Sequence, residues 1–295
     1  MSIIVVHGGA GRVSDQNRRS LALEGVKEAV QIGWDILNKG GSAVDAVEAA
    51  VVSMENNPNF NAGLGSVVTR DKTIEMDALI MDGSTREIGG VIGISRVKNP
   101  ITLSRHILDK ETHVLFFGEH AEKLWEKYGF QLINPDELFT DRILQRYENF
   151  MKDQEMEVDD PEGRKYGTVG AVALDANGNL AAATSTGGVL GKMTGRVGDT
   201  PIIGAGTYAD EDVAVSATGI GEYIIKGMMG INVKIFSQTN SFTNACDKAL
   251  SHFKGAIGKA GLIAVNNKGE WSARKTTQDL IFAKLDDSGL EVFDV

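Results

Sequence analysis

The chain has 295 residues, 42% of them hydrophobic and 24% charged, which is enough apolar material for one large core. A formal net charge of −10 without any basic cluster argues against a nucleic-acid partner or an anionic membrane surface. The single cysteine, Cys246, excludes an intrachain disulfide. The first residues have neither the basic segment nor the apolar length of a signal peptide, and no run is long enough to span a membrane, so a cytoplasmic location is expected.

The first half of the chain combines short apolar runs with helical patterns. Residues 3–7 predict a buried strand that enters a glycine turn at 8–11. Residues 17–38 predict a helix with one apolar stripe, and Ser42 is the expected N-cap of a second helix. Residues 66–95 predict strands broken by a turn at 82–84, and residues 100–150 have a mostly helical pattern.

The composition changes at residues 141–167, where eight acidic and five basic side chains predict an exposed, mobile connector. The second half is then rich in β patterns. Strands apolar on both faces, together with helices in both halves, predict a single α+β domain with sheets between helical layers. The expected strands lie at 168–175, 180–186, in short runs up to 217, and at 260–266, 271–275 and 280–284; the expected helices lie at 221–230 and 241–254.

Thr168 begins the first strand of a predicted hairpin, and the turn between the strands sets its partner. If 177–178 form a two-residue loop, Thr168 faces Gly187. If 176–178 form a three-residue loop with Gly178 in the left-handed conformation, Thr168 faces Thr186 instead. The second register is favoured because Asp175, with Gly178 three residues later, suits a type I turn followed by a glycine bulge.

Four blocks carry a resemblance to a known family: GTVGAV at 167–172, TSTGG at 184–188, GRVGD at 195–199 and TGIGE at 218–222. In this order and at this spacing, the chain resembles the plant-type L-asparaginases and isoaspartyl peptidases, which are N-terminal nucleophile hydrolases. The resemblance covers nearly the whole chain except the connector. It implies a four-layer αββα sandwich, no organic cofactor, and hydrolysis of L-asparagine and β-aspartyl (isoaspartyl) dipeptides.

The resemblance makes Thr168 the nucleophile, which has a chemical reason. A threonine hydroxyl needs a base, and a backbone amide nitrogen cannot serve because its lone pair is delocalised. A free α-amine, with a pKa of about 7.7–8.0, can serve near neutral pH. Autocleavage of the Gly167–Thr168 bond would create that amine and leave an α subunit of residues 1–167 and a β subunit of residues 168–295. Thr186 is placed to orient and activate the nucleophile.

Arg196 and Asp199 form the expected substrate anchor. A guanidinium binds a carboxylate through two hydrogen bonds and a carboxylate binds an ammonium, which matches the α-groups of an L-aspartyl unit. From the residues alone, a solvated ion pair explains them equally well; the resemblance favours the anchor. It also implies that the Thr218 hydroxyl and the Gly219 N–H form the oxyanion hole. The carbonyl of Gly221 is expected to help bind the substrate amine.

Further residues receive roles from the resemblance alone. His7, Gly8 and Gly9 belong to a glycine loop that supports autocleavage, and the Asn61 side chain helps hold the nucleophile. A homodimer of αβ units is expected. A loop that binds a structural sodium ion is expected to use the backbone carbonyls of Met54, Glu55, Asn57, Phe60, Ala62 and Leu64, since a hard cation prefers oxygen ligands.

Other functions stay open at this point. Glycosylasparaginases usually have Asp before the threonine and a secretory signal, whereas Gly167 precedes Thr168 here. A threonine aspartase is a further alternative within the superfamily. From another class, the chain could be an unprocessed, inactive homologue that acts as a binding protein. The sequence does not decide between asparagine and isoaspartyl peptides as the preferred substrate.

Overall fold

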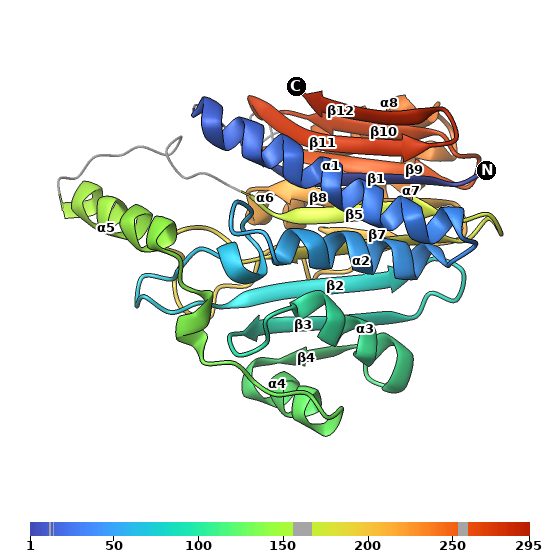
Figure 1. Ribbon diagram of the computed structural model, residues 1–295. Helices are drawn as coiled ribbons and strands as arrows, with labels where there is room; N and C mark the ends of the chain where they lie inside the picture. Colours follow the sequence, from blue (N-terminus) through green and yellow to red (C-terminus); the bar gives the residue numbers. More distant parts are fainter. Residues whose placement is uncertain (12, 14, 156–166, 253–258) are drawn as a thin grey trace.

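The computed structural model describes residues 1–11, 13, 15–155, 167–252 and 259–295 (Figure 1). Within them, two β-sheets lie face to face between outer helices. The eight-stranded sheet has the order β12-β11-β1-β5-β6-β2-β3-β4 and the four-stranded sheet the order β10-β9-β8-β7. Neighbouring strands are antiparallel except β3 and β4, which are parallel. The α+β, αββα prediction is confirmed.

The strands of the large sheet are β1 (Ile3–Gly11), β2 (Met76–Asp82), β3 (Ile88–Ile94), β4 (Leu115–Phe117), β5 (Val169–Leu174), β6 (Leu180–Thr186), β11 (Asp279–Asp286) and β12 (Gly289–Asp294). Those of the small sheet are β7 (Thr207–Ala209), β8 (Val213–Gly219), β9 (Ala260–Asn266) and β10 (Trp271–Lys275). The α-helices are α1 (Gln16–Asn38), α2 (Ala43–Glu55), α3 (Pro100–Lys110), α4 (Gly118–Lys127), α5 (Asp141–Glu155), α6 (Gly221–Gly227), α7 (Met229–Ser237) and α8 (Phe242–Ser251); short 3-10 helices lie at Gly63–Gly65 and Pro135–Leu138.

Three apolar cores separate the four layers. Along β5, Val169 packs toward α1 and α2, whereas Val172 packs toward the small sheet. This alternation follows from the two-residue period of a strand and buries both faces of the large sheet. A third core lies between the small sheet and the helices α6–α8. None of the helices in the described ranges is long and apolar enough to cross a membrane.

Several sequence predictions match the observed elements closely. The first helix begins at Gln16, where Asp15 caps it by accepting the N–H groups of Asn17 and Arg18. The Ser42 hydroxyl accepts the N–H of Asp45, which confirms the predicted N-cap of α2. Strands β6, β9 and β10 have the predicted bounds.

The prediction of a mobile connector at 141–167 is wrong for its first part. Residues 141–155 form helix α5, whose Ile143 is fully buried. Tyr147 donates a hydrogen bond to the carbonyl of Arg70 at 2.8 Å, and the Phe150 ring lies against Gly191. These apolar positions recur at three- and four-residue spacing and form a packed helix face despite the many charges. Residues 156–166 of the predicted connector lie outside the described residues.

Three smaller predictions also need correction. The expected glycine turn at 8–11 is part of β1, which continues to Gly11 with an irregular register between His7 and Ala10. The helix expected at 221–230 is two helices, because Met228 adopts a left-handed conformation with φ 44° that ends α6 and precedes α7. Strands β4 and β12 were not predicted; β4 follows helix α3, and β12 follows strand β11.

Candidate active site

The layer between the two sheets changes from apolar to polar at one end. Ile3 and Val5 of β1 and Ala214 of β8 contribute to the inter-sheet core. Further along the same faces, the two-residue period of each strand places hydroxyl and imidazole groups. These buried polar residues are His7 on β1, Thr168 immediately before β5, Thr184 and Thr186 on β6, and Ser216 and Thr218 on β8. A cluster of buried hydroxyls on paired strands is a candidate catalytic centre.

The hairpin β5–β6 has the favoured of the two predicted registers. Val169 pairs with Ser185 and Gly178 has φ 84°, as the three-residue loop requires. The turn is held by the N–H of Gly178, which donates to the carbonyl of Asp175 at 3.1 Å. Thr168 therefore lies beside Thr186, and its hydroxyl donates to Thr186 Oγ1 at 3.0 Å. The prediction that two threonine hydroxyls meet at the mouth of the hairpin is confirmed.

Thr186 is itself oriented by the backbone. The N–H of Gly188 donates to Thr186 Oγ1 at 2.9 Å. One lone pair of this hydroxyl oxygen accepts the Gly188 N–H, and the second is available to accept the Thr168 proton. The arrangement polarises the Thr168 O–H bond toward Thr186.

The bond between Gly167 and Thr168 lies against the glycine segment of β1. Gly9 has φ 113°, and a Cβ at this position would lie 2.7 Å from Gly167 Cα and 3.4 Å from Thr168 N. Only glycine permits both the backbone conformation and the close approach. On the other side, Asn61 Cβ lies 3.4 Å from the place that a Cβ of Gly167 would occupy. The predicted cleavage site is thus enclosed by the two segments that the sequence assigned to it.

His7 belongs to a buried hydrogen-bond chain behind the nucleophile. Its Nε2 lies 2.9 Å from Ser216 Oγ, which in turn lies 2.8 Å from Thr184 Oγ1. Burial lowers the pKa of His7 to about 3, so the ring is neutral. A Cβ at Gly170 would lie 2.0 Å from Ser216 Oγ, which explains why glycine stands two residues after Thr168. This chain of hydrogen bonds links the large sheet to the small sheet beside Thr168.

Thr218 and Gly219 end strand β8 on the same side of the layer. The Ala10 N–H donates to Thr218 Oγ1 at 3.2 Å. This contact fixes a lone pair of the hydroxyl and leaves its hydrogen free to donate to a substrate oxygen. Gly219 has φ 136°, and a Cβ there would meet the Lys259 carbonyl oxygen at 2.2 Å. The strand end therefore requires glycine, and it offers donors of the kind used in an oxyanion hole.

Arg196, Asp199 and Gly221 converge although strands β7 and β8 separate Gly221 from the other two in the chain. A Cβ at Gly221 would lie 2.8 Å from both Arg196 Nη2 and Asp199 Oδ1. The guanidinium also receives a partner that sequence reasoning missed: Arg196 Nε and Nη2 each donate to the Glu222 carboxylate at 2.9 Å. Glu222 was part of the TGIGE block but had no assigned role. The Glu222 carboxylate binds the Nε–Nη2 edge of the guanidinium and thereby fixes the orientation of the opposite edge.

The Asp199 carboxyl group is buried, and one of its two oxygens has no hydrogen-bond donor among the described residues. Its side chain is 5% exposed, and Oδ2 has no hydrogen-bond donor within the described residues. Burial raises the pKa of Asp199 to about 7, against the opposing influence of Arg196. A buried carboxylate oxygen that lacks a donor is costly for the fold. It is a suitable receptor for a ligand ammonium group.

Asn61 holds the loop beside the nucleophile. Its Nδ2 donates to the Gly188 carbonyl at 2.7 Å, and its Oδ1 accepts the Val67 N–H at 2.9 Å. Gly188 is also the residue whose N–H orients Thr186. Asn61 therefore contacts the Thr168–Thr186 pair through Gly188, and the hydrogen bonds of its side chain go to backbone groups.

In the predicted sodium-binding loop, two glycines lie close to backbone carbonyl oxygens of the same loop. A Cβ at Gly65 would lie 1.9 Å from the Phe60 carbonyl oxygen, and a Cβ at Gly63 would lie 2.4 Å from that of Glu55. The carbonyls of Met54, Asn57 and Ala62 each accept an N–H three residues ahead. Each carbonyl has a second lone pair for a cation. The glycines leave the room that a cradle of oxygen ligands needs, so the residues fit a hard monovalent cation.

Glu55 was assigned a role only through its backbone carbonyl, whereas its side chain has contacts that were not predicted. Its carboxyl group is fully buried, and burial raises its pKa to about 8. Ser185 Oγ donates to it at 2.6 Å and the Ile101 N–H at 3.0 Å. Ser185 lies between Thr184 and Thr186, on the opposite face of β6. Glu55 therefore ties the nucleophile hairpin to α2 and to the start of α3.

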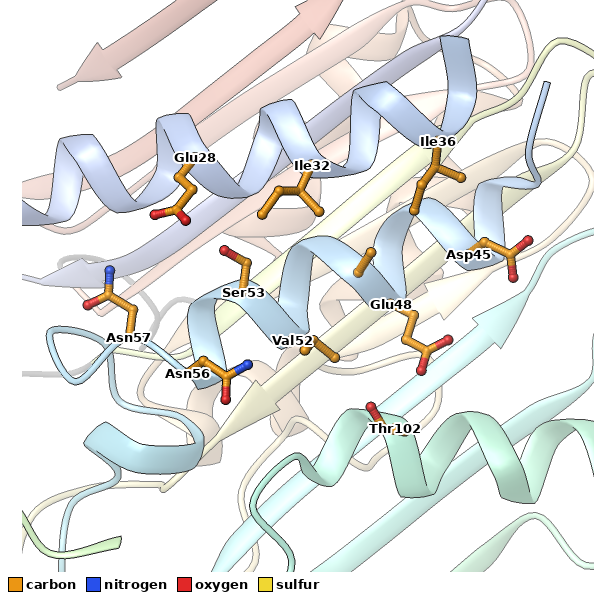
Figure 2. A pocket seen from close by; sticks show the side chains of 11 residues that line it. Glu28, Ile32, Ile36, Asp45, Glu48, Val52, Ser53, Asn56, Asn57 and Thr102 are labelled. Carbon is orange, nitrogen blue, oxygen red and sulfur yellow. The ribbon is translucent and has the colours of Figure 1, made fainter. Parts of the chain in front are cut away.

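A surface pocket of about 880 Å³ lies elsewhere, in the outer helix layer (Figure 2). It is lined by α1, α2, the residues that follow α2 and the start of α3, with Ile32 and Ile36 on α1 and Val52 on α2. Two of its acidic residues, Asp45 and Glu48, are paired with Arg105. Of the predicted site residues, only Asn57 lines it. The pocket is separate from the hydroxyl cluster.

Comparison with known proteins gives one consistent result. A family model described as Asparaginase matches residues 1–293. The isoaspartyl peptidase/L-asparaginase of Danio rerio is 42% identical over 286 residues, covering 96% of this chain and 92% of that protein. That of Mus musculus is 42% identical over 293 residues, covering 98% and 89%. The plant-type L-asparaginase of Pyrococcus horikoshii is 42% identical over 306 aligned residues, covering 99% and 98%.

Proposed function

The chain belongs to the asparaginase family, and from this premise we propose that it is a threonine-dependent amidohydrolase that acts on L-asparagine and on β-aspartyl dipeptides. Its αββα fold is that of the N-terminal nucleophile hydrolases. The observation that carries the proposal is the hydrogen bond between Thr168 and Thr186, at the end of the layer where Thr218 also lies. The relatives named isoaspartyl peptidase/L-asparaginase support the same substrate class.

We propose that the chain activates itself by cleaving before Thr168. Thr168 Oγ1 passes its proton toward Thr186 and attacks the carbonyl carbon of Gly167. The bond from that carbon to Thr168 N then breaks, the nitrogen takes up a proton, and an ester joins Gly167 to the threonine oxygen. Water hydrolyses the ester, which frees the Gly167 carboxylate and the Thr168 α-amine. The close packing of Gly9 against this bond supports the cleavage site.

In the cleaved enzyme, the α-amine of Thr168 is the general base. It removes the hydroxyl proton as Oγ1 attacks the side-chain carbonyl of the substrate. The Thr218 hydroxyl and the Gly219 N–H stabilise the resulting oxyanion. Ammonia or an amino acid leaves after protonation by the same amine, and water then hydrolyses the acyl-enzyme. Because the α-amine acts first as the base and then as the acid, the proposed reaction needs no other proton carrier beside the Thr168–Thr186 hydroxyl pair.

Substrate orientation comes from the groups around Gly221. The free edge of the Arg196 guanidinium binds the α-carboxylate, while Asp199 and the Gly221 carbonyl bind the α-ammonium. The unpartnered oxygen of Asp199 supports this assignment, because the substrate would supply the donor that the described part of the chain does not. L-Asparagine and β-aspartyl dipeptides present the same two groups. Both are therefore proposed as substrates.

Other proposals accompany this one. The carbonyl cradle at residues 54–64 fits a structural sodium ion, which would fix the loop that bears Asn61. In that role the cation stabilises the fold and takes no part in the chemistry. The dimer of αβ units and the cytoplasmic location stay predictions.

Purified wild-type protein tests the function directly. We expect mass spectrometry to find chains of 167 and 128 residues, since 295 − 167 is 128. The cleaved protein should release ammonia from L-asparagine and aspartate from β-aspartyl dipeptides. Protein that stays whole after days of incubation, and hydrolyses neither substrate, would instead favour a binding protein.

The raised pKa of Asp199 predicts a pH dependence of ligand binding. Only the ionised carboxyl attracts an ammonium group, so affinity is present above the folded-state pKa of about 7 and is lost as the pH falls through it. The inhibition constant of the product L-aspartate should rise about tenfold per pH unit below pH 7. Asp199→Asn should bind weakly at every pH. A slope that persists in Asp199→Asn would assign the titration to another group.

A further inference from the structure

We propose that Glu75, Asp77 and Lys192 form a positioning frame that sets the distance between the nucleophile pair and the substrate anchor. The proposal rests on the proposed function, since it assigns the frame to the Arg196–Asp199 anchor of that site. The frame was not visible in the sequence, because Lys192 is far from the other two residues along the chain. In this frame the Glu75 carboxylate binds Gly195, the Asp77 carboxylate binds Gly198, and Lys192 supplies a buried ammonium group.

Each of the two carboxylates holds one glycine of the anchor segment. The Gly195 N–H donates to the two oxygens of Glu75 at 3.1 and 2.9 Å. The Gly198 N–H donates to Asp77 Oδ2 at 3.4 Å, while Oδ1 accepts the Gly93 N–H at 2.9 Å. The two glycines bracket Arg196. The backbone on both sides of the guanidinium is therefore fixed by carboxylates that lie two residues apart, on one face of the extended chain.

Lys192 places a buried positive charge beside the half-buried Glu75 and the buried Asp77. Its side chain is 2% exposed, and Nζ donates to the Glu75 carbonyl at 2.8 Å and lies 4.0 Å from Glu75 Oε2. Burial lowers the pKa of Lys192, and the charges of Asp77 and Glu75 oppose that shift. Burial likewise raises the pKa of Asp77, and Lys192 opposes it. The Lys192 ammonium and the Asp77 carboxylate therefore each favour the charged form of the other.

The frame reaches the nucleophile by two routes. Asp77 is the residue of β2 that pairs with Thr186 of β6. The Lys192 ammonium also lies against Gly188, where an added Cβ would be 3.0 Å from Nζ. Gly188 orients the Thr186 hydroxyl through its N–H. One buried cluster thus contacts both the segment that orients the nucleophile and the segment that carries the substrate anchor.

Glu75 offers the cleanest test because its side chain is 18% exposed, so its replacement does not disrupt a core. In Glu75→Leu, the Gly195 N–H loses its acceptor, whereas Glu75→Gln keeps one. We expect backbone amide exchange in residues 194–199 to become about tenfold faster in Glu75→Leu, as the loss of a hydrogen bond to a charged group predicts. The KM for L-asparagine should rise about tenfold with kcat nearly unchanged.

Glu75→Gln should restore most of both properties, and Glu211→Leu, which removes an exposed partner of Arg86, should change neither. Unchanged exchange in Glu75→Leu would overturn the frame whether or not the enzyme is active. Faster exchange with an unchanged KM would overturn its link to substrate binding. If wild-type protein hydrolyses neither substrate while exchange responds to Glu75, the proposed function fails and the assignment to a substrate anchor fails with it.

Discussion

Thr168→Ala protein should remain a single chain of 31.6 kDa and should hydrolyse neither L-asparagine nor β-aspartyl dipeptides. The substitution removes the only oxygen that the proposed cleavage and turnover share. Activity should fall on the order of 10⁴-fold or more, because removal of a nucleophile disables the whole catalytic group. Denaturing electrophoresis and intact mass after long incubation measure the cleavage, and ammonia release measures the turnover.

Two variants separate the nucleophile from its surroundings. Thr168→Ser keeps a hydroxyl at the same place beside Thr186, so it should still cleave, although more slowly. Thr85→Ala changes an exposed threonine in the turn between β2 and β3 and should behave as wild type. Two bands from Thr168→Ala protein would rule out self-cleavage by this residue.

The register of the nucleophile hairpin could be predicted because local chemistry determines it. Asp175 Oδ1 accepts the N–H groups of Asn177 and Asn179, and Gly178 supplies the left-handed residue. Once the turn is fixed, the two-residue period of the strands places Thr168 next to Thr186. The Ser42 cap of α2 could be predicted for the same reason, since it binds an N–H three residues ahead.

Features that depend on distant segments could not be predicted. Helix α5 resembles a charged connector because its apolar positions are few, and the contacts of Tyr147 with Arg70 and of Phe150 with Gly191 join segments far apart in the chain. The left-handed Met228 contradicts the helical pattern around it. Here tertiary packing decides between local alternatives that the sequence leaves nearly equal in energy.

The candidate site also combines residues that could be predicted with contacts between distant segments that could not. The family resemblance pointed to Arg196 and Asp199 as an anchor, but no spacing indicated that Glu222 takes one edge of the guanidinium. The resemblance also assigned Gly9 to a loop that supports autocleavage, but the contact of Gly9 with the Gly167–Thr168 bond is seen only in the fold. The roles assigned to these residues stay proposals. What the fold adds is the proximity on which those roles depend.

Arg196→Ala should lower kcat/KM for L-asparagine by about 10² to 10³-fold, mainly through KM. The substitution removes the donors for the substrate α-carboxylate and leaves the Glu222 carboxylate unpaired beside it, so the substrate is also repelled. Cleavage before Thr168 should continue, because no contact of Arg196 reaches the hydroxyl pair. Arg196→Lys should recover only part of the loss, since an ammonium cannot bind both carboxylates as a planar fork does.

Arg86→Ala is the matched control for this prediction. Arg86 also binds one carboxylate, that of Glu211, through Nε and Nη2, but the pair is exposed. Its removal should leave kcat/KM unchanged, because an exposed ion pair contributes little. The double variant Arg196→Ala/Glu222→Gln separates binding from repulsion. If it hydrolysed L-asparagine as well as wild type, Arg196 would only neutralise Glu222, and the anchor for the α-carboxylate would have to lie elsewhere.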